Sequence, residues 1–163
     1  KERHDVGRPD DQGYPIRGMI RGDYLYLKNF ETERWPAGNP ETGYMNVDGS
    51  PTKTEVLKAK HNKETAYYWQ LSFGKRKAEE LYNIRKDPDC MVNLAEMPEY
   101  ETLKRKLEKE MTLRLVEQED PRMFGRGGLF DKYPDMSPAH QFWNRTEAGE
   151  KVRSGWVNPT DFQ

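Results

Sequence analysis

The sequence has little cysteine, no long apolar run and no excess charge of either sign. Its single cysteine, Cys90, rules out an internal disulfide and a cluster of metal-binding thiolates, and we interpret it as a small apolar side chain. No apolar segment approaches the length of a membrane span, so no membrane partner is expected. The 27 Lys and Arg residues balance the 28 Asp and Glu residues, which argues against a nucleic-acid partner.

Apolar residues are scarce as well. They make up 34% of the 163 residues, below the usual share in soluble domains. Aromatic residues, at 12%, offset this in part because each buries a large area. The composition therefore predicts one ordered domain with a modest core and long surface segments. Residues 1–4 contain no apolar segment of the kind found in a signal peptide.

Alternating residue types predict a β-hairpin near the start of the chain. Side chains alternate in character over residues 16–21 and again over residues 24–30, as in strands that bury one face. Gly22 and Asp23 between them are a two-residue turn signal. A third strand is predicted over residues 78–84, where the same alternation recurs.

The clearest predicted helix begins at Pro98 and runs to about Gln118, since proline suits a first helical position. Its apolar residues recur at steps of three and four, and the opposite face is charged. We expect the apolar face to lie across the sheet. Shorter helices are predicted over residues 52–60, with Thr52 as the N-cap, and over residues 66–73. The apolar face of the long helix consists of Tyr100, Leu103, Leu107, Met111 and Leu115.

These elements predict an α+β fold. A small antiparallel β-sheet of about four strands would pack against one long amphipathic helix, with long ordered loops and a C-terminal tail. The pattern does not place the fourth strand, and residues 67–73 are a candidate for it as well as for a helix. We predict a first domain over residues 1–122, and an aromatic-rich tail over residues 123–163 that packs on the main body or on another domain.

Few residues have a pattern that indicates a binding site. Arg3 and His4 share a polar loop: arginine offers a forked donor to sulfate or phosphate, and histidine titrates near neutral pH. The alternative is that both are simply exposed. Trp35 and Tyr44, in the long loop over residues 31–54, have ring faces that suit a sugar, although packing against the protein is the commoner fate of such rings.

Other chemistry finds little support. Asp10 and Asp11 are ligands that suit calcium or magnesium, but no further ligand sits at a useful spacing, so we interpret them as part of a turn. The glycine-rich residues 125–128 lack the Lys-Ser/Thr ending of a phosphate-binding loop. No Ser/His/Asp set or pair of carboxylates can be assembled. We therefore predict no catalytic residue and no metal site in this chain.

A series of stretches, none of them specific alone, occurs in a fixed order along almost the whole chain. In that order they resemble the C-terminal subdomain of sulfatases of the alkaline-phosphatase-like superfamily, particularly bacterial enzymes similar to N-sulfoglucosamine sulfohydrolase and other glycan sulfatases. The stretches are Glu2-Arg3-His4 with Gly13–Arg17, Arg21–Phe30, Arg34–Gly38 with Asp48–Lys53, Glu79–Ile84 with Asp87–Asp89 and Asn93–Ala95, Glu119–Arg122, and Gly155–Pro159.

The resemblance implies a sulfuric ester or sulfamate hydrolase acting in glycan or glycosaminoglycan degradation, with calcium and a formylglycine nucleophile. The Cys-or-Ser, x, Pro, x, Arg motif that becomes formylglycine is absent here, and in the family the calcium ligands belong to the N-terminal catalytic domain. This chain alone is therefore predicted to be inactive and to bind neither group. Because it begins where the family chain is in mid-course, we expect a fragment of a periplasmic or secreted enzyme rather than a separate subunit.

In the family, the loop that Arg3 and His4 resemble lies at the junction of the two domains. The resemblance thus implies that Arg3 and His4 face the sulfated sugar, and Trp35 is a further candidate for glycan selection. The partners would be the N-terminal catalytic domain of the same enzyme and the sulfated sugar. The alternative function is a non-catalytic carbohydrate- or protein-binding β-module that uses Trp35 and Tyr44.

Overall fold

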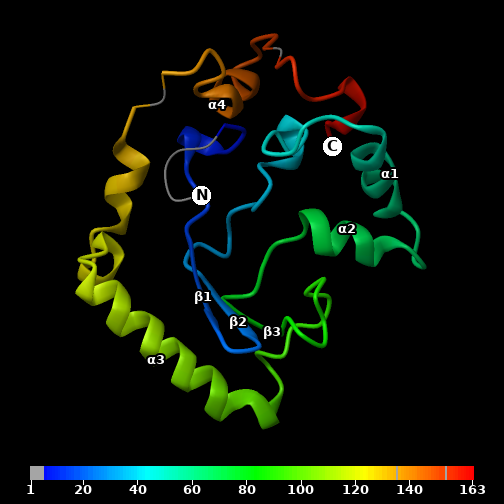
Figure 1. The fold of residues 1–163 in the computed structure, drawn as a ribbon. Coiled ribbons are helices and arrows are strands. Elements are labelled where there is room, and N and C mark those ends of the chain that lie inside the picture. The colour runs from blue at the N-terminus through cyan, green and yellow to red at the C-terminus, as the bar shows by residue number, and fades with distance from the viewer. Residues whose placement is uncertain (1–5, 135, 153) are drawn as a thin grey trace. The chain divides into compact units, whose positions relative to one another are not determined.

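The computed structural model describes residues 6–134, 136–152 and 154–163 (Figure 1). Contacts divide the chain into two compact units, each built from stretches that are distant in sequence. The domain boundary expected after residue 122 stays a prediction. The sheet unit comprises Pro15–Phe30 and Lys77–Leu129, and the loop unit comprises Lys1–Tyr14, Glu31–Arg76 and Phe130–Gln163.

The sheet unit contains a three-stranded antiparallel sheet in the order β1-β2-β3 (Figure 1). Its strands are β1 (Ile16–Arg21), β2 (Tyr24–Asn29) and β3 (Glu79–Asn83). β1 and β2 form the predicted hairpin, and Gly22 in its turn has φ +58°, a left-handed conformation that glycine adopts without steric cost. The hairpin and the third strand are confirmed.

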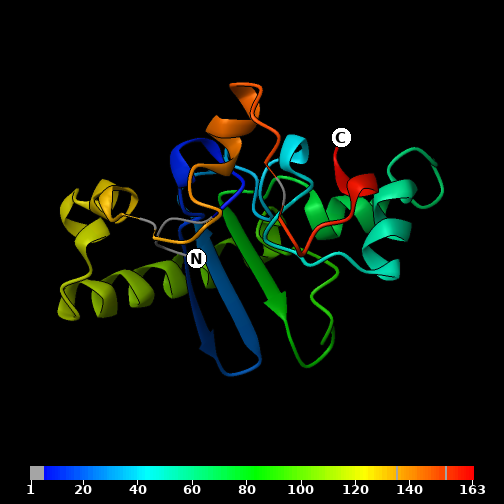
Figure 2. The same ribbon diagram turned by 90° about the horizontal axis from the view of Figure 1, so that it is seen from above.

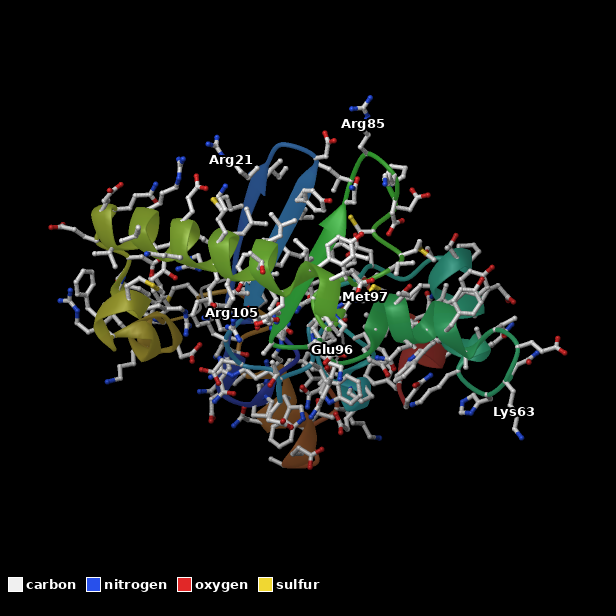
Figure 3. All side chains as sticks on the ribbon, turned by 90° about the horizontal axis from the view of Figure 1, so that it is seen from below. Arg21, Lys63, Arg85, Glu96, Met97 and Arg105 are labelled. Atoms are coloured by element: carbon white, nitrogen blue, oxygen red, sulfur yellow. The ribbon has the colours of Figure 1, made fainter. Side chains whose placement is uncertain are left out.

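Helix α3 (Glu101–Glu117) follows a 3-10 turn at the predicted proline start and runs across one face of the sheet (Figure 2, Figure 3). Leu107 and Met111 of α3 are 1% and 3% exposed and pack with Tyr26 and Leu81 of the sheet. Burying a side chain of this size contributes about 1.5–3 kcal/mol. The helix, its apolar face and its position on the sheet agree with the α+β prediction.

The expected fourth strand is not found in the part of the chain that the structure describes. Residues 67–73, the candidate for it, belong to helix α2 (Ala66–Phe73). A helix satisfies its backbone N–H and C=O groups within its own segment, whereas a strand in the loop unit would need a partner strand. No described segment of that unit is a strand, so the helical alternative prevails.

Helix α1 (Pro51–Ala59) differs from its prediction at its first turn. The N-cap is Ser50 and not Thr52, because the Ser50 side chain accepts a hydrogen bond of 3.1 Å from the backbone N–H of Lys53. Pro51 then occupies the first helical position, where its missing N–H costs nothing. α1 packs beside α2 within the loop unit (Figure 1).

The rest of the loop unit consists of helix α4 (Phe142–Glu147) and long ordered loops around two apolar clusters. One cluster centres on Tyr44 and Phe73, and the other on Met45 and Phe142. Residues 130–163 of the C-terminal tail belong to this unit, where the indole N–H of Trp156 donates to the Met45 carbonyl at 2.9 Å. Among the described residues, 3-10 turns lie at Pro9–Asp11, Pro40–Thr42, Pro98–Tyr100, Pro121–Phe124, Gly127–Lys132 and Pro159–Asp161.

An ion pair fastens the end of α3 to β1 inside the sheet unit. Arg17 Nε donates to Asp120 Oδ2 at 2.6 Å, with 17% and 10% of the two side chains exposed. Burial disfavours the ionised carboxylate and so raises the pKa of Asp120. Hydrogen bonds from Arg17 and from the backbone N–H of Arg122 lower the pKa by more than burial raises it. Together with the charges of both arginines they hold the pKa of Asp120 below its ordinary value.

Replacing Asp120 with Asn should make the fold less sensitive to acid. A depressed folded-state pKa means that the carboxylate stabilises the fold above the unfolded pKa of about 3.9, and that this contribution is lost as pH falls through the folded pKa. We expect Asp120→Asn to lower the free energy of unfolding at neutral pH by about 2 kcal/mol and to flatten its decline in acid. Denaturant titrations from neutral to acidic pH measure the free energy of unfolding and its decline in acid. Asp89→Asn is the control, because Asp89 is exposed. An acid decline as steep as that of the unaltered protein would contradict this account.

Candidate functional site

The predicted site residues fall on two segments of the loop unit. Arg3 and His4 lie outside the described residues. Trp35 is described, and it lies partly buried in the segment of residues 31–50, here called the Trp35 loop. The structure also describes the residues that directly follow Arg3 and His4 in sequence, from Val6 onward, so the anchoring of that stretch can be compared with the position of Trp35.

Arg8 joins these two segments. Its side chain is fully buried, and its guanidinium donates to the carbonyl of Trp35 at 2.6 Å through Nε and to that of Pro36 at 2.9 Å through Nη2. Nη1 donates to the carbonyl of Gln12 at 3.1 Å. A buried cation is tolerated where hydrogen bonds replace its hydration, and a planar guanidinium can reach several carbonyls at once. Arg8 therefore fixes the backbone of Trp35 to the N-terminal segment.

Gly7 makes a second contact between the same segments. Its carbonyl accepts hydrogen bonds of 2.8 Å from the backbone N–H of Asn39 and from the hydroxyl of Thr42. Gly7 has φ +84°, and a Cβ added there would lie 2.8 Å from Cβ of Met45. This close approach in a left-handed conformation requires glycine.

Two acidic residues complete the anchoring of the N-terminal segment. Asp11 accepts a hydrogen bond from the backbone N–H of Gln141, and Asp10 exchanges two hydrogen bonds with Asn144 of α4, at 2.8 and 2.9 Å. Both aspartates lie in a 3-10 turn, as their interpretation as turn residues predicts. Their oxygens bind protein groups and hold the segment against α4.

Arg34 ties the start of the Trp35 loop to the segment that contains Asp131. Arg34 Nη2 and Asp131 Oδ2 are 2.9 Å apart, and both side chains are about four-fifths buried, with 18% and 19% exposed. Arg34 Nη1 donates to the carbonyl of Gly13 at 2.8 Å, and Asp131 Oδ1 accepts from the backbone N–H of Gly13 at 3.1 Å. Two arginines therefore join these segments: Arg8 binds the Trp35 loop, and Arg34 binds Gly13.

The ring of Trp35 belongs to an aromatic cluster. It meets the rings of Tyr44 and Trp69 edge-on, with centroids 6.2 and 6.3 Å away, and Tyr44 in turn packs on Phe73 at 4.7 Å. Tyr44 is fully buried, and burial raises the pKa of its hydroxyl. Its ring is therefore closed to a sugar, and of the two aromatic residues named in the alternative function only Trp35 retains exposed surface.

Two ammonium groups lie over this cluster. Lys75 Nζ is 5.6 Å from the centroid of the Trp35 ring, and Lys60 Nζ is 4.8 Å from that of Trp69. Lys75 also pairs with Glu33 at 3.2 Å. An aromatic surface bordered by positive charge suits a sugar ring that carries sulfate, since the ring packs on the aromatic face and the anion pairs with the ammonium groups.

Sequence reasoning missed Arg8 and Trp69. Arg8 stands in a polar stretch between Gly7 and Pro9, and nothing local distinguishes it from an exposed arginine, because the carbonyls of Trp35 and Pro36 lie 27 and 28 residues away. Trp69 had a weak signal: it stands four residues before Phe73 in the segment that was predicted as a short helix, so the two share one helical face.

The described residues contain no group of three or more His, Cys, Asp and Glu side chains placed to hold a metal ion. None of the helices described has the length and apolarity needed to cross a bilayer. No protein-family model matches the chain, and no curated protein is significantly similar to it in sequence.

Proposed function

We propose that this chain is the C-terminal part of a sulfatase that hydrolyses sulfate esters or sulfamates of a sugar or glycan. It supplies a wall of the substrate pocket, with Arg3, His4 and Trp35 facing the sulfated sugar. The N-terminal catalytic domain of the same enzyme supplies the nucleophile. Such an enzyme would work in the periplasm or be secreted, where glycans are degraded.

The observation that carries the proposal is the contact made by Arg8. It binds the carbonyl of Trp35, and it stands four residues after His4 in sequence. Arg8 is fully buried, so the described part of the N-terminal segment, from Val6 onward, is anchored to the Trp35 loop. Rigid support of this kind is what a substrate-positioning group requires.

Each proposed residue has a distinct role. The Arg3 guanidinium binds the sulfate oxygens through paired hydrogen bonds, and the His4 imidazole supplies a further polar group beside the sugar. Trp35 packs against the apolar face of the sugar ring, with Lys75 close by to pair with a negative group. These contacts orient the sulfated sugar for attack at sulfur.

The family's formylglycine and calcium do not fit this chain. The sequence lacks the motif that becomes formylglycine, and the described residues offer no cluster of ligands for calcium. When present in the complete enzyme, these groups supply the nucleophile and stabilise negative charge on the transferring group. No catalytic step is assigned to residues of this chain.

His4→Ala in the full-length enzyme should lower kcat/KM for sulfate release by about tenfold, the effect of losing one hydrogen bond to the charged sulfate group. Release of inorganic sulfate from a sulfated glucosamine oligosaccharide measures this. His61→Ala is the matched control, because His61 is an exposed histidine on the turn between α1 and α2. Unchanged kinetics of the His4 variant would contradict the role of His4. Glycan binding without sulfate release in the unaltered protein would instead favour the non-catalytic module.

A further inference from the structure

A groove of about 640 Å³ lies between α1 and α2 in the loop unit and is here called the α1–α2 groove. Its floor is apolar, formed by side chains that include Val56 and Ala59 of α1. Tyr68 of α2 forms one wall. The groove is large enough for a sugar ring, since sites for small organic ligands start at about 300 Å³.

Tyr68 forms half of an exposed aromatic platform. The rings of Tyr67 and Tyr68 stack with centroids 4.0 Å apart and planes inclined by 34°. The two residues are 48% and 47% exposed, whereas Phe73 of the same helix is 3% exposed. Two large rings stacked on each other at the mouth of a groove leave a broad apolar face in contact with water. Such a face matches the apolar face of a pyranose ring.

Polar groups surround the apolar floor. Glu55 and Lys58 line the groove and pair with each other at 2.8 Å. The amide of Asn62 also lines it, with Oδ1 accepting from the backbone N–H of Glu64 at 2.9 Å and its NH₂ group still a donor. The hydroxyl of Thr65 donates to the carbonyl of Ala59 at 3.5 Å and still has lone pairs that accept. Sugar hydroxyls donate and accept as well, so this mixture of groups suits them.

Two lysines, Lys58 and Lys63, lie at this end of the two helices, together with the acidic residues Glu55 and Glu64. Lys58 lines the groove, and Figure 3 shows Lys63 projecting from the turn that joins α1 and α2. Lys58 and Lys63 are both exposed. Their ammonium groups complement a ligand that carries sulfate groups.

We propose that the α1–α2 groove binds a pyranose ring of a sulfated oligosaccharide. The apolar face of the ring packs on Tyr68, and its hydroxyls bond to Glu55 and Asn62. A sulfate on the ring or on its neighbour lies near Lys58 and Lys63. The identity of the ligand as a sulfated glycan rests on the proposed function, whereas the binding of a sugar ring rests on the groove alone.

Isothermal titration of the full-length protein tests this with a sulfated glucosamine-containing tetrasaccharide and with its chemically desulfated form. The desulfated probe measures binding of the sugar rings without sulfate, and the dependence of that binding on Tyr68 assigns it to the groove. Tyr68→Ala should weaken binding of the desulfated probe by about tenfold, the loss expected for an aromatic anchor. Tyr68→Phe keeps the ring and should bind within about twofold of the unaltered protein. The unaltered protein should bind the sulfated probe more tightly than the desulfated probe. In the double variant Lys58→Gln/Lys63→Gln, this difference in affinity between the two probes should be smaller.

Phe124→Ala is the matched control, because Phe124 is 48% exposed and lies in the sheet unit. The proposal is overturned if Tyr68→Ala binds the desulfated probe as tightly as the unaltered protein, or if the unaltered protein binds neither probe. Sulfate release reports separately on the proposed function. Tyr68-dependent binding without sulfate release would overturn the sulfatase assignment and leave the sugar-binding groove in place.

Discussion

Replacing Arg8 with Met should lower the free energy of unfolding by about 3 kcal/mol, because it leaves buried carbonyls without a donor. The methionine keeps an apolar stem of similar length, so the loss reports on the guanidinium. The carbonyls concerned are those of Trp35, Pro36 and Gln12. The same change should reduce sulfate release by the full-length enzyme, since it frees the Trp35 loop from the segment that follows Arg3 and His4.

Denaturant titration measures the stability effect, and hydrogen exchange of the Trp35 loop locates it. Arg8→Lys is an informative companion, because lysine keeps the charge but cannot reach several carbonyls with a planar fork. The matched control is Arg114→Met, an exposed arginine of α3 that pairs with Glu110 and should leave stability unchanged. If Arg8→Met and Arg114→Met behave alike, Arg8 does not anchor the loop.

Lys53→Met should cost about 3–5 kcal/mol, because it leaves a buried carboxylate without its cation. Lys53 Nζ lies 3.1 Å from Asp161 Oδ2, and the two side chains are 1% and 0% exposed. The ammonium also donates to the carbonyls of Gly43 and Val47, each at 2.7 Å. Lys53 thus joins the Trp35 loop to the C-terminal tail within the loop unit, and its loss should release the tail.

Limited proteolysis of the tail, followed by mass spectrometry, shows this release directly. Lys58→Met on the same helix is the matched control, since Lys58 is 68% exposed in its side chain and pairs only at the surface with Glu55. The double variant Lys53→Met/Asp161→Asn should be more stable than Lys53→Met alone, because it removes the unpaired charge. A single variant as stable and as protease-resistant as Lys58→Met would contradict the role of this pair.

Local patterns were sufficient to predict the sheet unit. The hairpin turn at Gly22 and the helix α3 depend on residues that are close together in sequence. The local pattern is therefore enough to predict them. The N-cap of α1 was misplaced because Thr52 and Ser50 carry the same kind of side chain, and only the hydrogen bond to Lys53 distinguishes them. Residues 66–73 fitted both a helix and a strand, and the lack of a partner strand decided between them.

The anchors of the candidate site could not be predicted in this way. Arg8 and Lys53 are charged residues in polar stretches, where the usual expectation is exposure. Their partners, Trp35 and Asp161, lie 27 residues and more than 100 residues away in sequence. Whether such a charged residue is buried depends on how the loops pack against one another. A short stretch of sequence around the residue does not contain that information. The roles of Arg3, His4 and Trp35 came from the family resemblance and remain part of the proposal.

Mass spectrometry of the native protein tests the central claim most directly, by measuring its intact mass and mapping the peptides that purify with it. We predict a polypeptide much larger than the 19.2 kDa of this chain, with a formylglycine-bearing peptide in the part that precedes it. A co-purifying chain that carries formylglycine would equally place this chain in a working sulfatase. A native mass of 19.2 kDa with no formylglycine in the preparation would contradict the claim and leave a binding role for the chain.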